Sequence, residues 1–203
     1  MTTECLENAL RLGAATLHEA QSRTGDLPAA IRPVWQGARL AAPAYTVQVT
    51  PGNNLLIHRA VYEAPSGSVL VVATGGPEGY DWGYWGDILT AAAQQRGLAG
   101  LVIDGCVRDV AAIQALGFPL FARGTAIRGT TKSPQGHCGQ PVLIGHVWVH
   151  LGDLLVADGD GAVVVPQAHI SEVLTAAEER ANKEAGIIKR IAAGESTLSI
   201  YSF

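Results

Sequence analysis

The sequence is poor in cysteine and has no long apolar runs. It contains three cysteines among 203 residues, Cys5, Cys106 and Cys138. An odd, scattered set without a Cys-x-x-Cys pair fits reduced thiols better than a disulfide framework. No apolar run approaches the roughly 20 residues of a membrane span. The N-terminus lacks the basic segment and apolar core of a secretory signal. We therefore expect a cytoplasmic protein with no membrane partner.

Charge is also scarce. Charged residues make up 16% of the chain, the formal net charge is -4, and lysine and arginine nowhere form the basic patch that nucleic-acid binding needs. Apolar residues make up 48%, and this balance argues against disorder. The length suits one sizeable domain, and neither repeats nor a linker interrupt it. We expect a single domain over residues 1–203 and no nucleic-acid partner.

Extended and helical patterns alternate in the middle of the chain. Apolar runs bounded by glycine predict strands, and segments with helical spacing that end at glycine predict helices. Together they predict a parallel sheet with right-handed crossovers. The expected strands cover 38–52, 68–76, 98–105 and 118–124, and the expected helices cover 53–67, 87–97 and 108–117.

The two ends of the chain have a different pattern. Residues 6–22 have helical spacing broken at Gly13, and residues 168–194 predict a long, charged, amphipathic helix. Short β runs over 125–132, 140–150 and 153–166 have no helix between them and predict an antiparallel second layer. The whole pattern indicates an α/β fold, a layered β/β/α sandwich similar to swivelling domains.

Two predicted strand-to-helix corners, Gly83–Asp87 and Asp104–Asp109, should lie at the same edge of the parallel sheet, where ligands bind. The unpaired N–H groups at a helix start favour an anion such as a carboxylate. Arg108 can hold a carboxylate with two hydrogen bonds, and Asp87 and Asp109 offer oxygen ligands to Mg²⁺ or Mn²⁺. A 2-oxo acid bound to such an ion is polarised toward its enolate.

A structural interpretation of the same residues stays open. An aspartate at a helix start is usually an N-cap worth about 1 kcal/mol, and an adjacent arginine is usually a solvated charge. A lysine that forms an imine with the substrate is the other route to an enolate. The only lysines are Lys132, Lys183 and Lys189, and we expect none of them at the corner, which disfavours that route.

The corner residues also carry a resemblance. Asp87, followed after twenty residues by Arg108-Asp109, resembles the signature of the 4-hydroxy-4-methyl-2-oxoglutarate aldolases, which share a fold with the regulator of ribonuclease activity A proteins. Similar segments follow in family order over roughly residues 10 to 195: "RPVWQGARLAAPAYTV", "NNLLIHRA", "GLVIDGCVRDVAAIQALGFPLFARG" and "HLGDLLVADGDGAVVVP". Because "NNLLIHRA" is among them, His58 is the histidine most worth testing.

The resemblance implies roles for individual residues. Asp109 would anchor a divalent metal, Mg²⁺ or Mn²⁺, largely through waters, and Asp87 would orient one of those waters for proton transfer. Arg108 would hold the pyruvate part of the substrate. Glu184 would reach the site of a neighbouring subunit in a homotrimer or hexamer. Backbone amides would bind the substrate carboxylate at Trp85, Gly86, Ile88 and Leu89.

The implied activity is that of a metal-dependent class II aldolase. It would cleave 4-hydroxy-4-methyl-2-oxoglutarate or 4-carboxy-4-hydroxy-2-oxoadipate to pyruvate and would also decarboxylate oxaloacetate. The sequence departs from the family pattern at Ala112, at Asn53 and in the loop 79–86, whose two tryptophans could narrow the pocket. These departures affect the expected substrate more than the expected metal site. Two alternatives remain: a non-catalytic protein that regulates a ribonuclease, and a decarboxylase of another 2-oxo acid.

Overall fold

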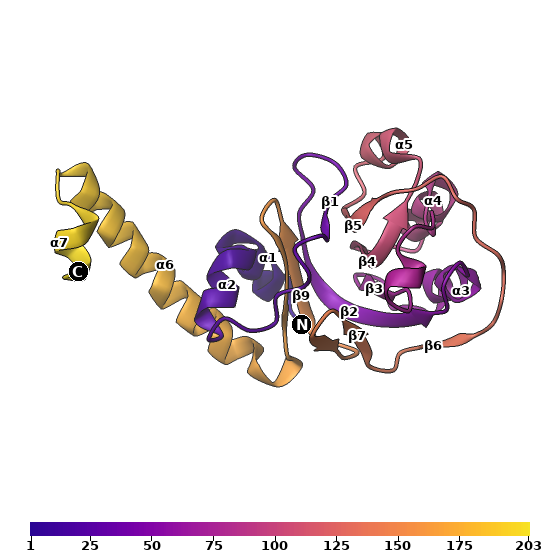
Figure 1. The fold of residues 1–203 in the computed structure, drawn as a ribbon. Coiled ribbons are helices and arrows are strands. Elements are labelled where there is room, and N and C mark those ends of the chain that lie inside the picture. Colours follow the sequence, from indigo (N-terminus) through magenta and orange to yellow (C-terminus); the bar gives the residue numbers. More distant parts are fainter.

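The computed structural model describes residues 1–203 as one α/β domain (Figure 1). The α-helices are α1 Thr3–Leu12, α2 Ala14–Ala20, α3 Leu55–Glu63, α4 Asp87–Gln95, α5 Val110–Ala115, α6 Ile170–Ala192 and α7 Thr197–Tyr201. The strands are β1 Arg32–Pro33, β2 Leu40–Val49, β3 Val69–Ala73, β4 Gly100–Val107, β5 Leu120–Thr125, β6 Gly136–Cys138, β7 Val142–Ile144, β8 Val147–Val149, β9 Leu154–Asp158 and β10 Gly161–Val165.

The predicted α/β class is confirmed, and one long strand connects the two halves of the sheet. Strand order is β1-β5-β4-β3-β2-β9-β10, with β6 also paired to β2. β2 pairs in parallel with β3 at one end and antiparallel with β9 at the other. Strands β9 and β10 therefore continue the parallel sheet, whereas β7 and β8 form a separate two-stranded antiparallel sheet. The sheet curls until β10 lies near β1, as in a nearly closed barrel (Figure 1).

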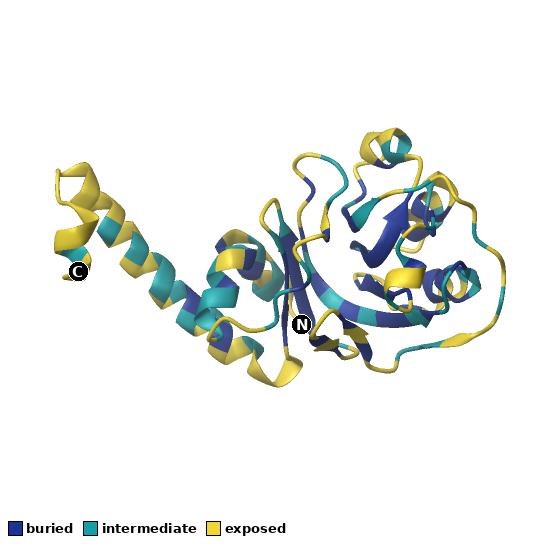
Figure 2. Ribbon diagram, viewed as in Figure 1, coloured by how far each residue is buried: buried dark blue, intermediate teal, exposed yellow.

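Burial explains why the apolar runs become central strands. Every residue of β3 and β4 is buried, as expected for parallel strands covered on both faces (Figure 2). Helices α3, α4 and α5 cover one face through side chains such as Ile57, Leu89 and Ile113. The other face lines the inside of the curled sheet, where Val71 and Phe121 meet residues of β7 to β10. The carboxyl ends of β3, β4 and β5 thus share one edge of a rigid layer.

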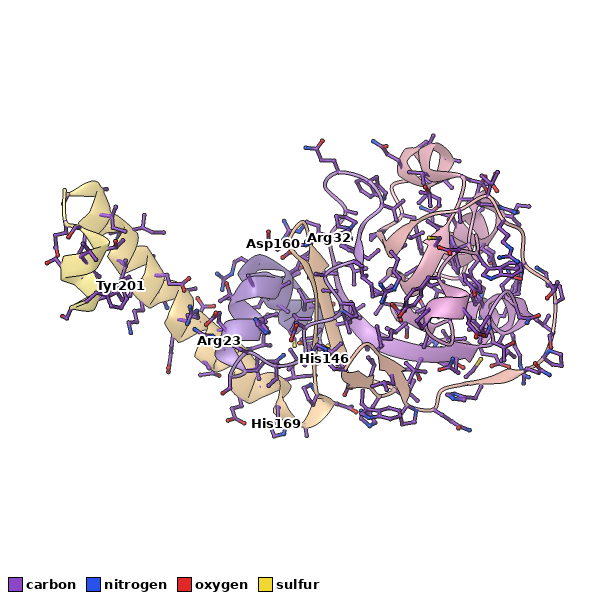
Figure 3. The ribbon with its side chains drawn as sticks, viewed as in Figure 1. Arg23, Arg32, His146, Asp160, His169 and Tyr201 are labelled. Carbon is purple, nitrogen blue, oxygen red and sulfur yellow. The ribbon has the colours of Figure 1, made fainter.

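The gap between the two ends of the sheet is spanned by a side chain. The guanidinium of Arg32 donates a hydrogen bond of 2.6 Å to the backbone carbonyl of Asp160, in the β9–β10 turn. These two residues lie side by side in Figure 3.

One prediction about the second half is wrong. Residues 126–132, all but the first residue of the expected β run over 125–132, are irregular apart from an isolated bridge between Asn53 and Thr131, and the irregular segment continues to residue 135. The alternation of small and β-branched residues resembles a strand there, but the backbone hydrogen bonds of the segment go to the end of β4, to Gly83 and to the loop before α3. Its path brings it to the sheet edge where β3 to β5 end.

The long C-terminal helix is present as predicted, within the expected range 168–194. Its first half packs on α1, α2 and β10 through Val173 and Ala177. Its second half and α7 extend away from the body, and Figure 2 shows them largely exposed. No helix in the structure combines the length and the apolar character that crossing a membrane requires.

Candidate functional site

Asp109 occupies the N-cap position of α5 but does not cap it. Its backbone is left-handed, with φ 61° and ψ 35°, and its carboxylate accepts no hydrogen bond from α5. A capping aspartate normally has extended backbone and accepts from the second or third N–H group of its helix. Instead Oδ2 of Asp109 faces the start of α4, 3.4 Å from the backbone nitrogen of Asp87. The N-cap interpretation of Asp109 is therefore wrong.

Gly86 provides the space into which this carboxylate projects. A Cβ atom on Gly86 would lie 2.2 Å from Oδ2 of Asp109, a distance at which the carboxylate must move. The backbone of Gly86 is extended, so space and not dihedral preference requires a glycine here. The position of the Asp109 carboxylate beside α4 thus depends on the missing side chain at Gly86.

Asp87 is the first residue of α4 and is not its N-cap either, because Gly86 holds that position without a side-chain bond. Its Oδ1 accepts from the neighbouring N–H of Ile88 at 2.7 Å. The N–H groups of Gly86 and Leu89 make no hydrogen bond within the chain. The start of α4 therefore keeps free donors, together with the positive end of its dipole, for an anion.

Arg108 joins the two corners. Its backbone N–H donates to the carbonyl of Trp85 at 2.8 Å. Its side chain is 47% exposed, and its nearest carboxylate is that of Asp109, with 3.5 Å between Nε and Oδ2. So long and exposed a pair leaves most guanidinium donors free for a ligand.

Beside Arg108 lies a pocket of about 240 Å³, large enough for a small organic acid. Asp109 faces an adjoining open hollow that Arg108 also lines. The pocket is lined by Asn54, His58, Gly83–Leu89, Arg108, Gly129, Thr130 and Lys132. The structure thus brings together the predicted residues Trp85, Gly86, Asp87, Ile88, Leu89, Arg108 and Asp109.

The position of Lys132 contradicts one prediction from the sequence. The sequence predicts no lysine at the corner, yet Lys132 lines the same pocket as Arg108 and Asp87. Its ammonium donates to Oδ1 of Asn54. Burial, with a smaller effect from the charge of Arg108, lowers the pKa of Lys132. A missing lysine is therefore no argument against an imine route.

Lys132 reaches the pocket because the irregular segment is tied to the loop before α3. Thr131 donates its N–H to the carbonyl of Gly52 at 2.8 Å and accepts from Asn54 at 3.2 Å. Asn54, which is 5% exposed, donates its side-chain amide to the carbonyl of Tyr84 at 2.8 Å. Only one orientation of that amide can serve both a carbonyl and an ammonium, so its oxygen faces Lys132. Asn53 supports this arrangement from outside the pocket through Thr131.

The two tryptophans of the loop do not narrow the pocket, contrary to the sequence interpretation. The indole of Trp85 is 1% exposed, stacks on Phe118 and donates to Thr90, so it belongs to the core and only the backbone of its loop serves the site. Trp82 stacks under the guanidinium of Arg128, 3.5 Å from ring centroid to Cζ, and is not among the residues that line the pocket.

Glu184 is not brought to the pocket within one chain. It lies on α6, across the molecule from α4 and α5 in Figure 1, and pairs with Arg180 at 2.9 Å. Its predicted role in a neighbouring site stays a prediction. His58 does line the pocket, and burial, with a smaller effect from the charge of Lys132, lowers its pKa.

The donor set for a metal is sparse. The chain holds no group of three or more histidine, cysteine, aspartate or glutamate side chains positioned to bind one ion. Asp109, with a side chain 39% exposed, and Asp87 supply the carboxylates at the two corners. Such a set can hold only an ion that keeps most of its waters or takes oxygens from a substrate.

Comparison with known proteins gives one consistent family. A profile of the RraA-like family, described as Aldolase/RraA, matches residues 12–164. A protein of Halalkalibacterium halodurans that carries the provisional name 4-hydroxy-4-methyl-2-oxoglutarate aldolase is 38% identical over 155 residues, 76% of this chain and 73% of that protein.

Solved structures of related sequence have the same fold as this chain. A protein of uncharacterised function from Pseudomonas syringae superposes with a TM-score of 0.85 at 32% identity, covering 97% of this chain and 92% of that one. Streptomyces coelicolor RraAS2, described as an unusual member of the RNase ES inhibitor RraA family, gives a TM-score of 0.78 at 29% identity, with 91% and 96% covered.

Proposed function

Because the chain belongs to the RraA-like family, Aldolase/RraA, we propose that it is a divalent-metal-dependent carbon–carbon lyase. Its substrates would be 4-hydroxy-4-methyl-2-oxoglutarate or 4-carboxy-4-hydroxy-2-oxoadipate, with oxaloacetate decarboxylation as a side activity. The observation that carries the proposal is the carboxylate of Asp109, which turns away from its own helix toward Gly86 and the start of α4.

The donor set fits a hard divalent cation with few protein ligands. Mg²⁺ is usually held by one or two carboxylates and keeps several waters, which suits the exposed Asp109 with Asp87 beside it. Asp109 would hold the ion, and substrate oxygens would complete its ligands. The bound ion would supply positive charge next to the 2-oxo group as the pyruvate enolate forms.

The chain's own groups bind and orient the substrate. The free N–H groups of Gly86 and Leu89 and the guanidinium of Arg108 bind the carboxylate next to the 2-oxo group. In that position the C3–C4 bond breaks, its electron pair moves toward the 2-oxo group, and the 4-hydroxyl loses its proton to become a carbonyl. Asp87, exposed at the pocket wall, orients a water that takes the proton of the 4-hydroxyl, and C3 finally takes up a proton to give pyruvate.

The proposed activity is tested by following pyruvate release from both hydroxy acids and from oxaloacetate, with Mg²⁺, with Mn²⁺ and with EDTA. Turnover should appear with either ion, disappear in EDTA and return when Mg²⁺ is added in excess. Full turnover in EDTA would contradict the role of the metal. Pyruvate from oxaloacetate alone would indicate a decarboxylase.

A second candidate is a protein that regulates a ribonuclease, as the description of the Streptomyces relative says of its own family. The observation in its favour is the exposed apolar end of the chain, where Leu198, Tyr201 and Phe203 have no partner surface in one chain. Absence of turnover on all three substrates, with metal present, would favour this candidate.

We further propose that the chain forms a homotrimer or hexamer in which Glu184 reaches a neighbouring site. Glu184 is 44% exposed and lies where α6 leaves the body of its own chain. Sedimentation equilibrium should give three or six times the chain mass. A monomer at micromolar concentration would contradict the shared site and the role of Glu184.

A further inference from the structure

We propose that Trp82 and Arg128 are positioning residues, which together hold the segment 126–132 against Arg108 and fix its guanidinium before a ligand carboxylate arrives. Neither residue lines the pocket, so both act through the backbone that lies between them and Arg108. The inference rests on the proposed function for the role of Arg108 in binding the carboxylate next to the 2-oxo group. It gives a role to a tryptophan of the loop 79–86, where the sequence departs from the family pattern.

The indole of Trp82 connects three stretches of chain. A Cβ atom on Gly52 would lie 2.9 Å from two atoms of the indole ring, so Trp82 closes directly over the backbone of the loop before α3. Its Nε1 donates to the carbonyl of Glu78, four residues earlier, at 3.3 Å. The guanidinium of Arg128 lies over the ring, 3.5 Å from the centroid to Cζ, where a cation is attracted to the aromatic face. Trp82 thus joins the segment after β5 to the loop 79–86 and to the loop before α3.

The backbone of the segment is fixed at the same point and passes beside Arg108. The carbonyl of Arg128 accepts from the N–H of Gly83 at 2.8 Å. A Cβ atom on Gly83 would lie 2.3 Å from the carbonyl oxygen of Ala126 and 3.5 Å from Cδ of Arg108. A Cβ atom on Gly129 would lie 4.0 Å from Nη1 of Arg108. The side chain of Arg108 therefore lies against both the segment and the loop 79–86.

Arg108 depends on this support, because its own bonds hold the guanidinium loosely. Its side chain is 47% exposed, and its ion pair with Asp109 is 3.5 Å long. Ordering a long side chain when a ligand binds costs affinity, and a side chain that is ordered beforehand avoids that cost. The guanidinium of Arg128 forms no ion pair or hydrogen bond within the chain, so its stacking on Trp82 is the contact that holds the segment in place.

The experiment measures pyruvate binding by titration calorimetry with Mg²⁺ present. Trp82→Ala removes the ring and should weaken binding about three- to tenfold, the range expected when the ligand must order one long side chain. Arg128→Met, which removes the charge and keeps a long side chain, should weaken binding by a similar factor. Trp82→Phe keeps an aromatic face for the guanidinium and should restore most of the affinity.

A second cation–aromatic pair in the chain offers a matched control. The guanidinium of Arg96 lies 5.8 Å from the ring centroid of Tyr62. This pair stands where α4 and α3 end, whereas the pocket lies where the two helices begin. Tyr62→Ala also removes an aromatic partner of a guanidinium, and it should leave the pyruvate affinity unchanged.

The Arg108→Lys variant distinguishes positioning from a general loss of structure. Lysine lacks the planar guanidinium that lies beside Gly129. Trp82→Ala in the Arg108→Lys background should therefore weaken pyruvate binding less than about twofold further, so that the two changes are not additive. Equal losses in the two backgrounds would overturn the positioning role, and so would a loss that Trp82→Phe does not restore.

The binding data also separate this inference from the proposed function, because they need no turnover. Pyruvate affinity that depends on Trp82 in a protein without lyase activity would support the positioning role and contradict the lyase. Pyruvate release from the substrates, with Trp82→Ala at wild-type affinity, would do the opposite. A wild-type protein that does not bind pyruvate with Mg²⁺ would overturn the positioning role whatever its turnover.

Discussion

Two aspartate–arginine pairs lie near the end of β4, and they differ in almost every physical respect. Asp104 pairs with Arg123 at 2.6 Å, and their side chains are 5% and 18% exposed. Asp109 and Arg108 are 3.5 Å apart, with 39% and 47% exposed. Arg123 also stacks on Tyr80, 3.7 Å from the ring centroid. The first pair is saturated by partners within the chain, and the second has donors and oxygens to spare.

The comparison shows that residue type alone does not distinguish a structural ion pair from one that is available to a ligand at this edge of the sheet. Burial raises the pKa of Asp104 more than the bond and charge of Arg123 lower it, which is the behaviour of a buried pair with little net stabilisation. The pair instead fixes the start of the loop 80–86 through Tyr80. That loop leads to the free N–H groups of Gly86 and Leu89 at the start of α4, so the buried pair supports the exposed one.

The largest effect should come from breaking the buried pair. Arg123→Met leaves the carboxylate of Asp104 without its counter-ion and should cost about 3–5 kcal/mol of unfolding free energy at pH 8, measured by urea denaturation. The folded-state pKa of Asp104 should then rise further above the unfolded value. The loss of unfolding free energy therefore grows as the pH rises from the unfolded-state pKa of Asp104 to its folded-state pKa. We expect a smaller loss at pH 5 than at pH 8.

The matched control breaks the exposed pair in the same way. Arg108→Met should change the unfolding free energy by no more than about 0.5–1 kcal/mol, with no difference between pH 5 and pH 8. Equal losses for the two variants, or a loss for Arg123→Met that is larger at pH 5, would remove the distinction between the pairs.

A smaller effect should come from a change that preserves the charge of the exposed pair. Arg108→Lys removes the planar guanidinium but keeps the positive charge. Its kcat/KM for oxaloacetate should fall about ten- to a hundredfold, while the midpoint of thermal unfolding stays within a few degrees. An unchanged kcat/KM would mean that Arg108 does not grip the substrate carboxylate.

Much of the fold could be predicted because its signals are local. The buried runs that form β3 and β4, and the glycines after α4 and α5, act within a few residues of themselves. Parallel strands end at one edge, so the sequence alone predicts that Asp87, Arg108 and Asp109 lie together. Their conformations could not be predicted, because the position of the Asp109 carboxylate depends on the space left by Gly86 on another loop.

The position of Lys132 could not be predicted for a related reason. The segment 126–135 begins with an alternation typical of a strand, but hydrogen bonds to distant residues, among them Gly52 and Asn54, hold it in an irregular path. The sequence does carry one usable signal, because the segment follows a third parallel strand, β5, and so begins at the same edge. The interpretation of Trp85 failed because an aromatic residue in a glycine-rich loop gives no sign of whether it faces ligand or core.

The proposed chemistry depends most on the carboxylate of Asp109 serving a ligand and not its helix. Asp109→Asn keeps the shape of the side chain and tolerates left-handed backbone, so the melting temperature should be unchanged. Mg²⁺ titration followed by calorimetry, together with oxaloacetate turnover on the same preparation, should show metal affinity and activity lost together in a folded protein. Wild-type Mg²⁺ affinity and turnover in Asp109→Asn would contradict this role of Asp109.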